Sequence, residues 1–327
     1  MNIDKDTAKA EMQKMIKGED SFVLHECVTC YACEEYCRRG NHPFFLITDL
    51  QEKRSIFPVP KPLVKQWVNA FIPGRRDIQQ FWGAQEPVIS LCVFPEYINS
   101  IQGKLFENVS IIMGRHVCCQ PGYVHFGNPS IIRERLPGMI ENIARHDFEE
   151  VVFFHDECYS AFTSYASAYG IEIPFRPIHF FDYLFNKLKE RESEIKRLNI
   201  KAAYQRPCTS RLTPKKEHFV DDIFSLIGVE RVERRYDREN CLCCAGTIRG
   251  QQRYDLFVNV QRRNVEDMVE AGAEYCVFNC PACFSSLSEA VAKKGLKPIM
   301  MHDLCKLALA RSQLDGSDQV WIVYTNL

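Results

Sequence analysis

The sequence predicts an α/β protein in which a duplicated domain with parallel sheets follows a small helical, cysteine-rich region. Short apolar runs alternate with longer helical patterns, which is typical of βαβ units. Cysteines recur at matching intervals in the central and C-terminal parts of the chain, as expected for an internal repeat. The predicted segments are a cysteine-rich region over 1–56, an ordered linker over 57–87, a first copy over 88–199 and a second copy over 200–327.

The composition limits the classes of protein to consider. The chain has 327 residues, of which 46% are hydrophobic and 25% charged, so it has room for two or three globular domains. With a net charge of -1, the chain is not expected to bind nucleic acid or anionic lipid by electrostatic attraction. The N-terminus is charged throughout, and the apolar stretches are too short to span a bilayer. We therefore expect a soluble, cytoplasmic protein without a transmembrane segment.

The cysteine content is the most unusual feature of the composition. The chain contains 16 cysteines. Disulfides are rare in a reducing cytosol, so metal sites or redox chemistry are the expected explanations. Only Cys276 and Cys305 resemble ordinary core residues, because both lie on apolar runs. Nearly all of the others fall into three groups.

The first group is the run "CVTCYACEEYC" near the N-terminus, which contains Cys27, Cys30, Cys33 and Cys37. Its C-x2-C-x2-C-x3-C spacing is the ferredoxin-type pattern for a cubane [4Fe-4S] cluster. Zinc is the alternative, although zinc sites usually come as two separated C-x2-C pairs. Arg38 follows Cys37, where such runs usually have proline, and no second run exists. The fourth ligand is therefore open between Cys37, Cys241 and a cysteine of a partner subunit.

The second group lies in the C-terminal part of the chain. Cys208 is followed by 34 residues, then the adjacent Cys243 and Cys244, then 35 residues, then Cys280 and Cys283. A disulfide between neighbouring cysteines is strained, so Cys243 and Cys244 are not expected to bond each other.

The third group repeats this pattern in the central part. Cys92 is followed by 25 residues, then Cys118 and Cys119, then 35 residues, then His155 and Cys158. The second interval is the same in both copies. It places the histidine where the C-terminal copy has the first cysteine of its "CPAC" pair.

The local patterns predict where these residues lie in the fold. Apolar, β-branched runs predict strands within 86–92, 149–158, 200–208 and 273–283. Helical patterns cover 130–147, 193–198, 218–229, 254–272 and 281–295, and two more begin near His179 and His302. Each predicted strand ends at or just before a candidate ligand. Ligands of open parallel sheets bind at the carboxyl ends of the strands, so we expect metal centres there. We expect His179 and His302 to support neighbouring groups rather than to ligate metal.

The second cysteine group, with its "CCAG" and "CPAC" segments, resembles the cysteine-rich CCG domain. That domain occurs twice in the catalytic subunits of heterodisulfide reductases (subunits B and D) and in related subunits of glycerol-3-phosphate, glycolate, lactate and succinate oxidoreductases. Many members also carry ferredoxin-type runs before the pair. In the heterodisulfide reductase branch each motif holds a noncubane [4Fe-4S] cluster with five cysteine ligands. The resemblance implies such a cluster in the second copy.

The first copy departs from the family, because His155 replaces one of the five cysteines. Imidazole can ligate iron, and it raises the potential of a cluster when it replaces a thiolate. The other ring nitrogen of a ligating histidine should then bond a carboxylate or carbonyl, and Asp156 and Glu157 are the nearest candidates. The alternatives are a four-cysteine cubane, zinc, or no metal.

The resemblance implies an iron-sulfur electron-transfer subunit of a cytoplasmic, anaerobic redox complex. It would pass electrons between a cubane cluster and one or two CCG-type clusters. The alternatives are a catalytic heterodisulfide or disulfide reductase subunit and a structural metal-binding scaffold. The sequence has no G-x-G-x-x-G and no phosphate loop, so electrons are expected to come from a flavoprotein or iron-sulfur partner. A disulfide or a quinone is the expected acceptor if no further subunit takes the electrons.

Overall fold

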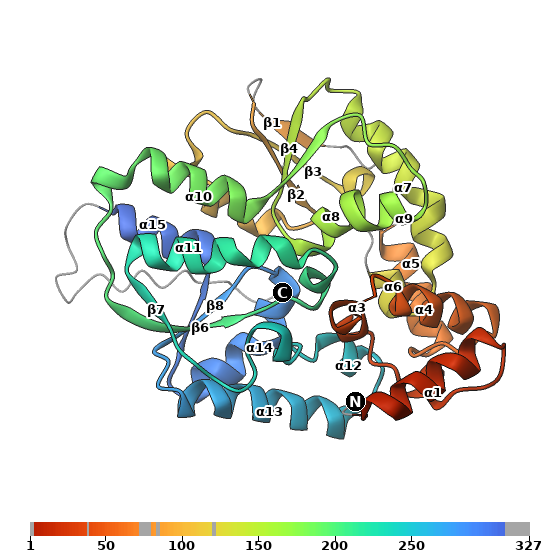
Figure 1. The fold of residues 1–327 in the computed structure, drawn as a ribbon. Coiled ribbons are helices and arrows are strands. Elements are labelled where there is room, and N and C mark those ends of the chain that lie inside the picture. The colour runs from red at the N-terminus through yellow and green to blue at the C-terminus, as the bar shows by residue number, and fades with distance from the viewer. Residues whose placement is uncertain (1–2, 38, 72–79, 83–85, 120–121, 311–327) are drawn as a thin grey trace.

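The computed structural model describes residues 3–37, 39–71, 80–82, 86–119 and 122–310. It confirms the α/β class: two mainly parallel sheets with helices around them form the body of the molecule, and a group of short helices lies at one side (Figure 1). Parts of the predicted linker (72–79 and 83–85), the end of the second copy (311–327) and Arg38 lie outside the described residues. None of the described helices is long and apolar enough to cross a membrane.

The N-terminal cysteine-rich region is helical. Its helices are α1 (Lys5–Ile16), α2 (Phe22–Glu26), α3 (Ala32–Tyr36) and α4 (Pro43–Lys53). The side chain of Asp4 caps α1, and that of Ser21 caps α2, by accepting hydrogen bonds from free backbone N–H groups. A small core of Met15, Leu24 and Ile47 holds these helices together.

The segment between the cysteine-rich region and the first copy contains regular structure. It holds α5 (Lys61–Phe71) and β1 (Gln80–Trp82). Strand β1 pairs antiparallel with β3 (Ser110–Met113) at the edge of the first sheet. The predicted linker thus adds one strand to the neighbouring sheet.

The first half of the body contains the five-stranded sheet β1-β3-β2-β4-β5. Its parallel strands are β2 (Val88–Cys92), β3, β4 (Glu150–Phe153) and β5 (Arg176–His179). Its helices are η1 (Pro95–Ser100), η2 (Lys104–Phe106), η3 (Arg115–Val117), α6 (Gly122–His125), α7 (Pro129–Ala144), α8 (Asp156–Ser160), the π-helix η4 (Ala161–Tyr165), α9 (Ala166–Ala168), α10 (Phe180–Glu190) and η5 (Glu192–Glu194).

The second half contains the four-stranded parallel sheet β7-β6-β8-β9. Its strands are β6 (Ile200–Gln205), β7 (Val229–Arg231), β8 (Tyr275–Phe278) and β9 (Lys297–Met300). Its helices are η6 (Cys208–Leu212), η7 (Pro214–Glu217), α11 (His218–Ile227), η8 (Arg238–Asn240), α12 (Gly246–Gly250), α13 (Tyr254–Glu270), α14 (Pro281–Lys293) and α15 (Met301–Leu309).

The strand orders bear out the predicted duplication. The order β3-β2-β4-β5 in the first half matches β7-β6-β8-β9 in the second, strand by strand along the chain. Strand β2, which ends at Cys92, and strand β6, which leads to Cys208, therefore hold equivalent places. The predicted helix over 193–198 is wrong, because only Glu192–Glu194 turn as a 3-10 helix before the chain extends toward β6. Six residues are too few to support an isolated helix.

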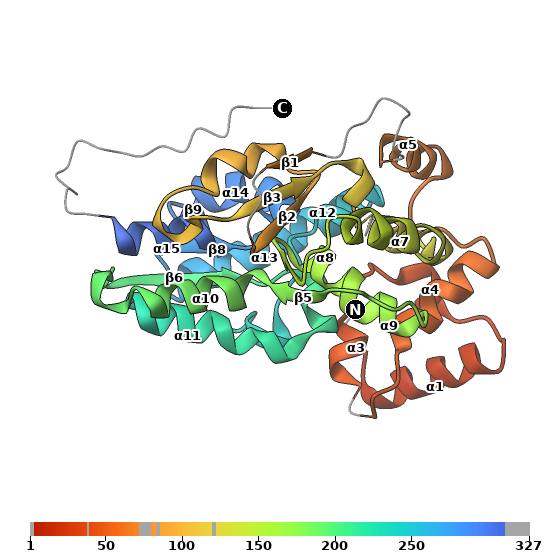
Figure 2. The ribbon, with the colours of Figure 1, turned by 90° about the horizontal axis from the view of Figure 1, so that it is seen from above.

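The two halves share one hydrophobic core. Helices α10, α11 and α15 lie between the two sheets (Figures 1 and 2). The core includes Leu91 of the first sheet, Val277 of the second, and Leu184, Phe224 and Leu304 of the three helices. Complete burial of an aliphatic or aromatic side chain contributes about 1.5–3 kcal/mol, so this layer fixes the halves against each other.

Candidate metal centres

The predicted ligands lie beyond the carboxyl ends of the strands, as expected for an open parallel sheet. Cys92 is the last residue of β2, and Cys208 follows β6 by three positions. His155 and Cys280 each stand two positions after the end of their strands, β4 and β8. The structure therefore gives His155 and Cys280 equivalent places in the two halves.

The first half brings four ligand atoms together. Those of Cys92, Cys119, His155 and Cys158 all lie within 4.8 Å of one another, and all four side chains are buried. The Cys92 and Cys119 sulfurs are 3.9 Å apart, and His155 Nε2 is 3.2 Å from the Cys158 sulfur. The thiol of Cys118 contacts Cys92 and lowers its pKa by hydrogen bonding.

The groups of this site shift one another's pKa, and burial raises the pKa of Cys119 and of Cys158. Hydrogen bonds from neighbouring thiols hold the pKa of Cys92 well below its usual range. Burial opposes the charged imidazole, but the Cys158 sulfur and Glu157 still hold the pKa of His155 well above its usual range. His155 Nδ1 donates to Glu157 Oε2 at 2.8 Å, which directs Nε2 toward the sulfurs. An imidazole held in this way by a carboxylate has the orientation of a metal ligand.

Of the two carboxylates expected beside His155, Glu157 therefore takes this place. Asp156 turns the other way. It pairs with the ammonium of Lys216 and accepts from Asn279 Nδ2 at 3.0 Å, and both of these residues belong to the second half. Asn279 directly precedes Cys280, so this contact joins the two ligand-bearing loops.

The five predicted cysteines of the second half influence one another electrostatically, although only Cys208 belongs to a compact group of possible ligands among the described residues. A hydrogen bond from Cys283 lowers the pKa of Cys244, and Cys283 also bonds Cys280. Burial raises the pKa of Cys208, and the nearby Cys243, Cys244 and Cys280 raise it further. These soft, desolvated thiols have the donor chemistry of an iron-sulfur site.

Three cysteines of the N-terminal run, Cys27, Cys30 and Cys33, also influence one another electrostatically. Burial raises the pKa of Cys27 to about 12, and Cys30 contributes to this shift. Burial also raises the pKa of Cys33, and Cys27 and Cys30 raise it further. Cys37 is half-buried and ends α3. Cys241 is buried elsewhere in the chain and accepts a hydrogen bond from Arg211 Nη2 at 3.0 Å. Both cysteines therefore remain candidates for the fourth ligand.

The loops that carry the ligands have unusual backbone conformations. Four non-glycine residues in them have positive φ: Thr29 (53°), Tyr31 (59°), Cys92 (56°) and Ala245 (65°). This region of backbone space is unfavourable for residues with a Cβ, and it is enriched at functional sites. In the loops of all three groups, the backbone therefore adopts conformations that these residue types disfavour, which is typical of loops that position functional side chains.

The three groups are neighbours. Burial and the neighbouring Cys244 raise the pKa of Cys243, and Cys30 of the N-terminal run raises it further. The Glu157 carboxylate, which bonds His155 in the first half, lies 3.6 Å from the Cys280 sulfur in the second. The N-terminal run also contacts the first half directly, because Thr29 Oγ1 lies 2.8 Å from His125 Nδ1 and Tyr31 bonds Tyr165.

Sequence reasoning missed one cluster of possible ligands at the junction. His125, Glu157 and Cys208 place their ligand atoms within 4.8 Å of one another. Glu157 was expected only as a hydrogen-bond partner of His155. His125 follows the adjacent cysteines of the first copy by six positions, and that proximity was the one signal in the sequence.

The two histidines expected to support neighbouring groups lie outside these ligand clusters of the described residues. His179 caps α10, accepting from the Phe181 N–H at 3.1 Å. His302 lies inside α15, and its Nε2 is 2.9 Å from Ser100 Oγ. The cap of α15 is Met300, so the two histidines are not equivalent.

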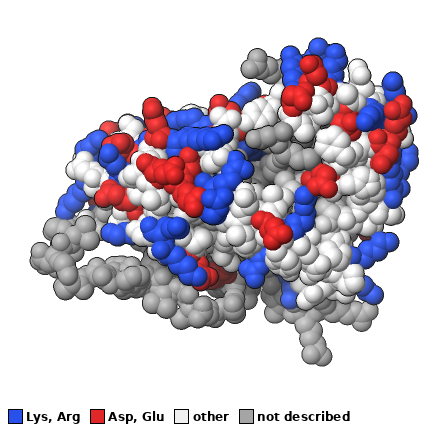
Figure 3. All heavy atoms as spheres, turned by 90° about the horizontal axis from the view of Figure 1, so that it is seen from below, with Lys and Arg blue, Asp and Glu red and all other residues white. Residues whose placement is uncertain are grey.

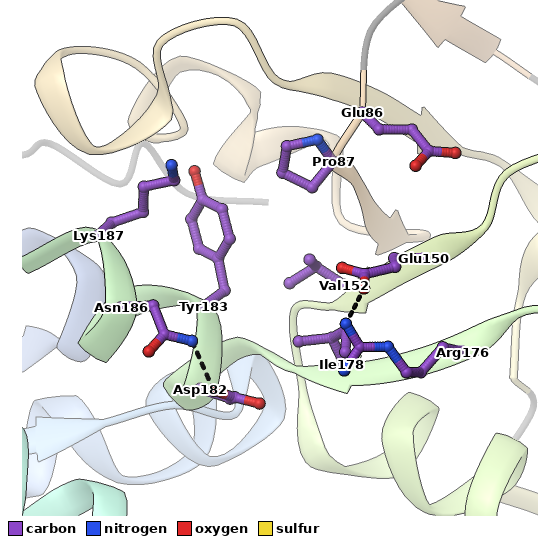
Figure 4. A pocket seen from close by; sticks show the side chains of 10 residues that line it. All are labelled: Glu86, Pro87, Glu150, Val152, Arg176, Ile178, Asp182, Tyr183, Asn186 and Lys187. Carbon is purple, nitrogen blue, oxygen red and sulfur yellow. Dashed lines mark hydrogen bonds and ion pairs between the residues drawn. The ribbon is translucent and has the colours of Figure 1, made fainter. Parts of the chain in front are cut away.

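A surface pocket in the first half is separate from the three groups. It lies near the amino ends of β2, β4 and β5 and beside α10 (Figure 4). Glu150 and Arg176 form an ion pair across it, and Asn186 bonds Asp182. Its lining contains none of the predicted ligands.

Comparisons with known proteins agree with this description. Residues 202–288 match the family described as the cysteine-rich CCG domain, which confirms a CCG domain in the second half. No curated protein matches the chain.

Two solved structures match the chain at low sequence identity. A hypothetical protein from Helicobacter pylori has a TM-score of 0.54 and 12% identity, and the match covers 94% of this chain and 65% of that one. This chain thus spans less than two thirds of that protein, and the likeness shows the fold alone. An aspartate racemase homologue from Pyrococcus horikoshii has a TM-score of 0.32 and 12% identity, covering 69% of this chain and 100% of that one.

Proposed function

We propose that the protein is an iron-sulfur electron-transfer subunit. It would pass electrons between a cubane cluster at the N-terminal run and one or two clusters of the CCG type. The observation that carries this proposal is the proximity of the three sets of cysteines: Cys30 raises the pKa of Cys243 electrostatically, and Glu157 lies between His155 and Cys280.

The residues fit the proposed clusters. Cys27, Cys30 and Cys33, with Cys37 or Cys241 as the fourth ligand, would hold the cubane. Cys208, Cys243, Cys244, Cys280 and Cys283 would hold the cluster of the second half, and Cys92, Cys118, Cys119, His155 and Cys158 that of the first. Bound clusters supply reversible one-electron transfer. The chain contributes buried thiolates, excludes water, and sets the charge of each site.

The direction of electron flow follows from the charge of the ligands. The second half offers five thiolates, whereas His155 makes the first site less negative. A less negative site is easier to reduce. We propose that electrons enter at the half-exposed N-terminal run and end at the first half.

The proposed partners are other redox subunits in the cytoplasm. The face drawn in Figure 3 carries interspersed acidic and basic side chains rather than one broad basic area. This distribution supports a protein or small-molecule partner over nucleic acid. A flavoprotein or iron-sulfur subunit as donor, and a disulfide or quinone as acceptor, remain the proposed reactants.

Two other functions have an observation in their favour. The centres of the two halves face each other across Glu157, as a reductase acting on a disulfide between them would require. The compact set of Cys92, Cys119, His155 and Cys158 fits a structural Cys3His zinc site. Turnover of small disulfides by the reduced protein would favour the first of these functions. Stoichiometric zinc without acid-labile sulfide would favour the second.

The deciding experiment is metal and redox analysis of the full chain purified without oxygen. Iron and acid-labile sulfide should both be present, and a redox titration followed by electron paramagnetic resonance should resolve the centres of the two halves at different potentials. Zinc without sulfide, or iron that does not change oxidation state, would exclude electron transfer.

A further inference from the structure

The junction between the two halves holds a ligand cluster that shares only Cys208 with the predicted cluster sites. His125 ends α6, and Glu157 lies in α8 after β4, both in the first half. Cys208 begins η6 after β6 in the second half. His125 and Glu157 are buried, with 5% and 9% of their surface exposed, so bulk water has little access to their polar atoms.

The hydrogen bonds of His125 determine which ring nitrogen is free to ligate. Thr29 Oγ1 donates its only hydrogen to the Val28 carbonyl at 2.8 Å. The same oxygen lies 2.8 Å from His125 Nδ1, so it accepts from Nδ1–H. Nε2 then carries the lone pair, and it faces the Cys208 sulfur at 3.9 Å. A ligating histidine is typically oriented by a hydrogen bond at its other nitrogen in this manner.

The Glu157 carboxylate lies in the same buried space. One of its oxygens accepts from His155, and the carboxylate lies 3.6–3.8 Å from the Cys280 sulfur. A buried carboxylate beside thiols is costly unless positive charge compensates it. His155 compensates this charge only while its imidazole is protonated, and Lys216 and Arg211 pair instead with Asp156 and Glu35.

We propose that the junction binds one divalent metal ion through His125 Nε2, the Glu157 carboxylate and the Cys208 thiolate. Nitrogen, oxygen and sulfur donors in one set suit zinc or ferrous iron. Three protein ligands leave a coordination position open for water or another anionic ligand. The site needs the Cys208 sulfur, which the second cluster would share, but it does not depend on electron transfer.

The test uses the full chain with its iron and sulfide restored, incubated with zinc chloride and then freed of unbound metal. The wild type should retain about one zinc per chain. His125→Gln should bind zinc at least ~10-fold more weakly, with iron and sulfide unchanged. His302→Gln is the matched control, because His302 is also buried at the contact between halves but has no part in this site. It should retain zinc as the wild type does.

X-ray absorption at the zinc edge identifies the donors. The expected shell has one sulfur at about 2.3 Å and nitrogen or oxygen at about 2.0–2.1 Å. A shell of three or four sulfurs would place the zinc at another cysteine group and overturn the proposal. Equal zinc retention by the His125 variant would also overturn it, as would loss of iron and sulfide together with zinc. Failure of the proposed electron transfer would appear instead in the redox titration of the wild type.

Discussion

The two halves have the same strand order but present different chemistry at equivalent places. After β4 the first half has His155, Asp156, Glu157 and Cys158, whereas after β8 the second half has Cys280, Pro281, Ala282 and Cys283. The backbone places the metal donors in both cases. The side chains decide the charge of the site and what the loop contacts across the junction.

The carboxylates found only in the first loop show this difference most directly. Asp156 forms an ion pair with Lys216 of the second half, and Glu157 orients His155 by a hydrogen bond. In the second half, Pro281 instead begins the long helix α14. The loop after β4 therefore carries the carboxylates that bond across the junction. The loop after β8 places its cysteines at the start of α14 and has no carboxylate.

The largest expected effect tests whether the N-terminal group is independent of both halves. Cys30→Ser should remove about four irons per chain, because a cubane that loses a ligand is not retained. The signals of the two halves should remain in electron paramagnetic resonance. Unchanged iron content, or loss of all signals together, would contradict this separation.

Restoring the thiolate should make the halves alike. His155→Cys should lower the potential of the first centre by on the order of 200 mV, because a thiolate adds negative charge where the imidazole had none. A redox titration followed by electron paramagnetic resonance compares the variant with the wild type. If the two proteins give the same signals and potentials, His155 is not a ligand.

The attachment of the N-terminal region to the second half is the next comparison. Glu35 accepts from Arg206 Nη1 at 2.8 Å and from Arg211 Nη1 at 2.6 Å, and both guanidinium groups are buried. Glu35→Gln leaves Arg211 without its carboxylate, whereas Arg206 keeps Glu217 at 3.3 Å, so the free energy of unfolding should fall by about 3 kcal/mol. Urea unfolding measures it.

The matched control for Glu35 is Glu26→Gln. Glu26 pairs with Arg253 at the surface, where its side chain is 51% exposed. An exposed pair contributes at most about 1 kcal/mol. A similar loss for both variants would show that the buried network does not attach the N-terminal region.

The smallest effect concerns pH. Burial lowers the pKa of His179 in the first half and of His302 in the second to about 4. An unfolded histidine titrates near 6.5, so the unfolded state binds more protons between these values. The stability due to each group is complete above about pH 6.5 and is lost as the pH falls toward 4.

The expected loss between pH 7 and 5 is about 2 kcal/mol for each histidine. His302→Gln should flatten the pH dependence of the unfolding free energy by this amount. His218→Gln, at an exposed helix position, is the control. An equally steep pH dependence in wild type and His302→Gln would contradict the neutral state of His302.

The sequence predicted the strands β2, β4, β6 and β8, because each is an apolar, β-branched run that ends near a candidate ligand. It did not predict β1, β3, β5, β7 or β9, which are short and do not end next to a predicted ligand. The equal 35-residue intervals also predicted the equivalence of His155 and Cys280. The meeting of His125, Glu157 and Cys208 could not be predicted, because it depends on how the two halves pack and which way an imidazole turns. The predicted helix over 193–198 was wrong because its apolar residues pack as extended chain.

The burial of the first-half cysteines has a consequence for biogenesis. Their side chains are no more than 2% exposed, and they lie in a core to which α7 and α8 of the first half and α4 of the N-terminal region contribute. An iron or sulfide donor does not reach these sulfurs once those helices have packed together. We expect the metal to be delivered while the chain is still open, so that maturation precedes final folding, and a centre damaged by oxygen is replaced with the protein rather than repaired within it.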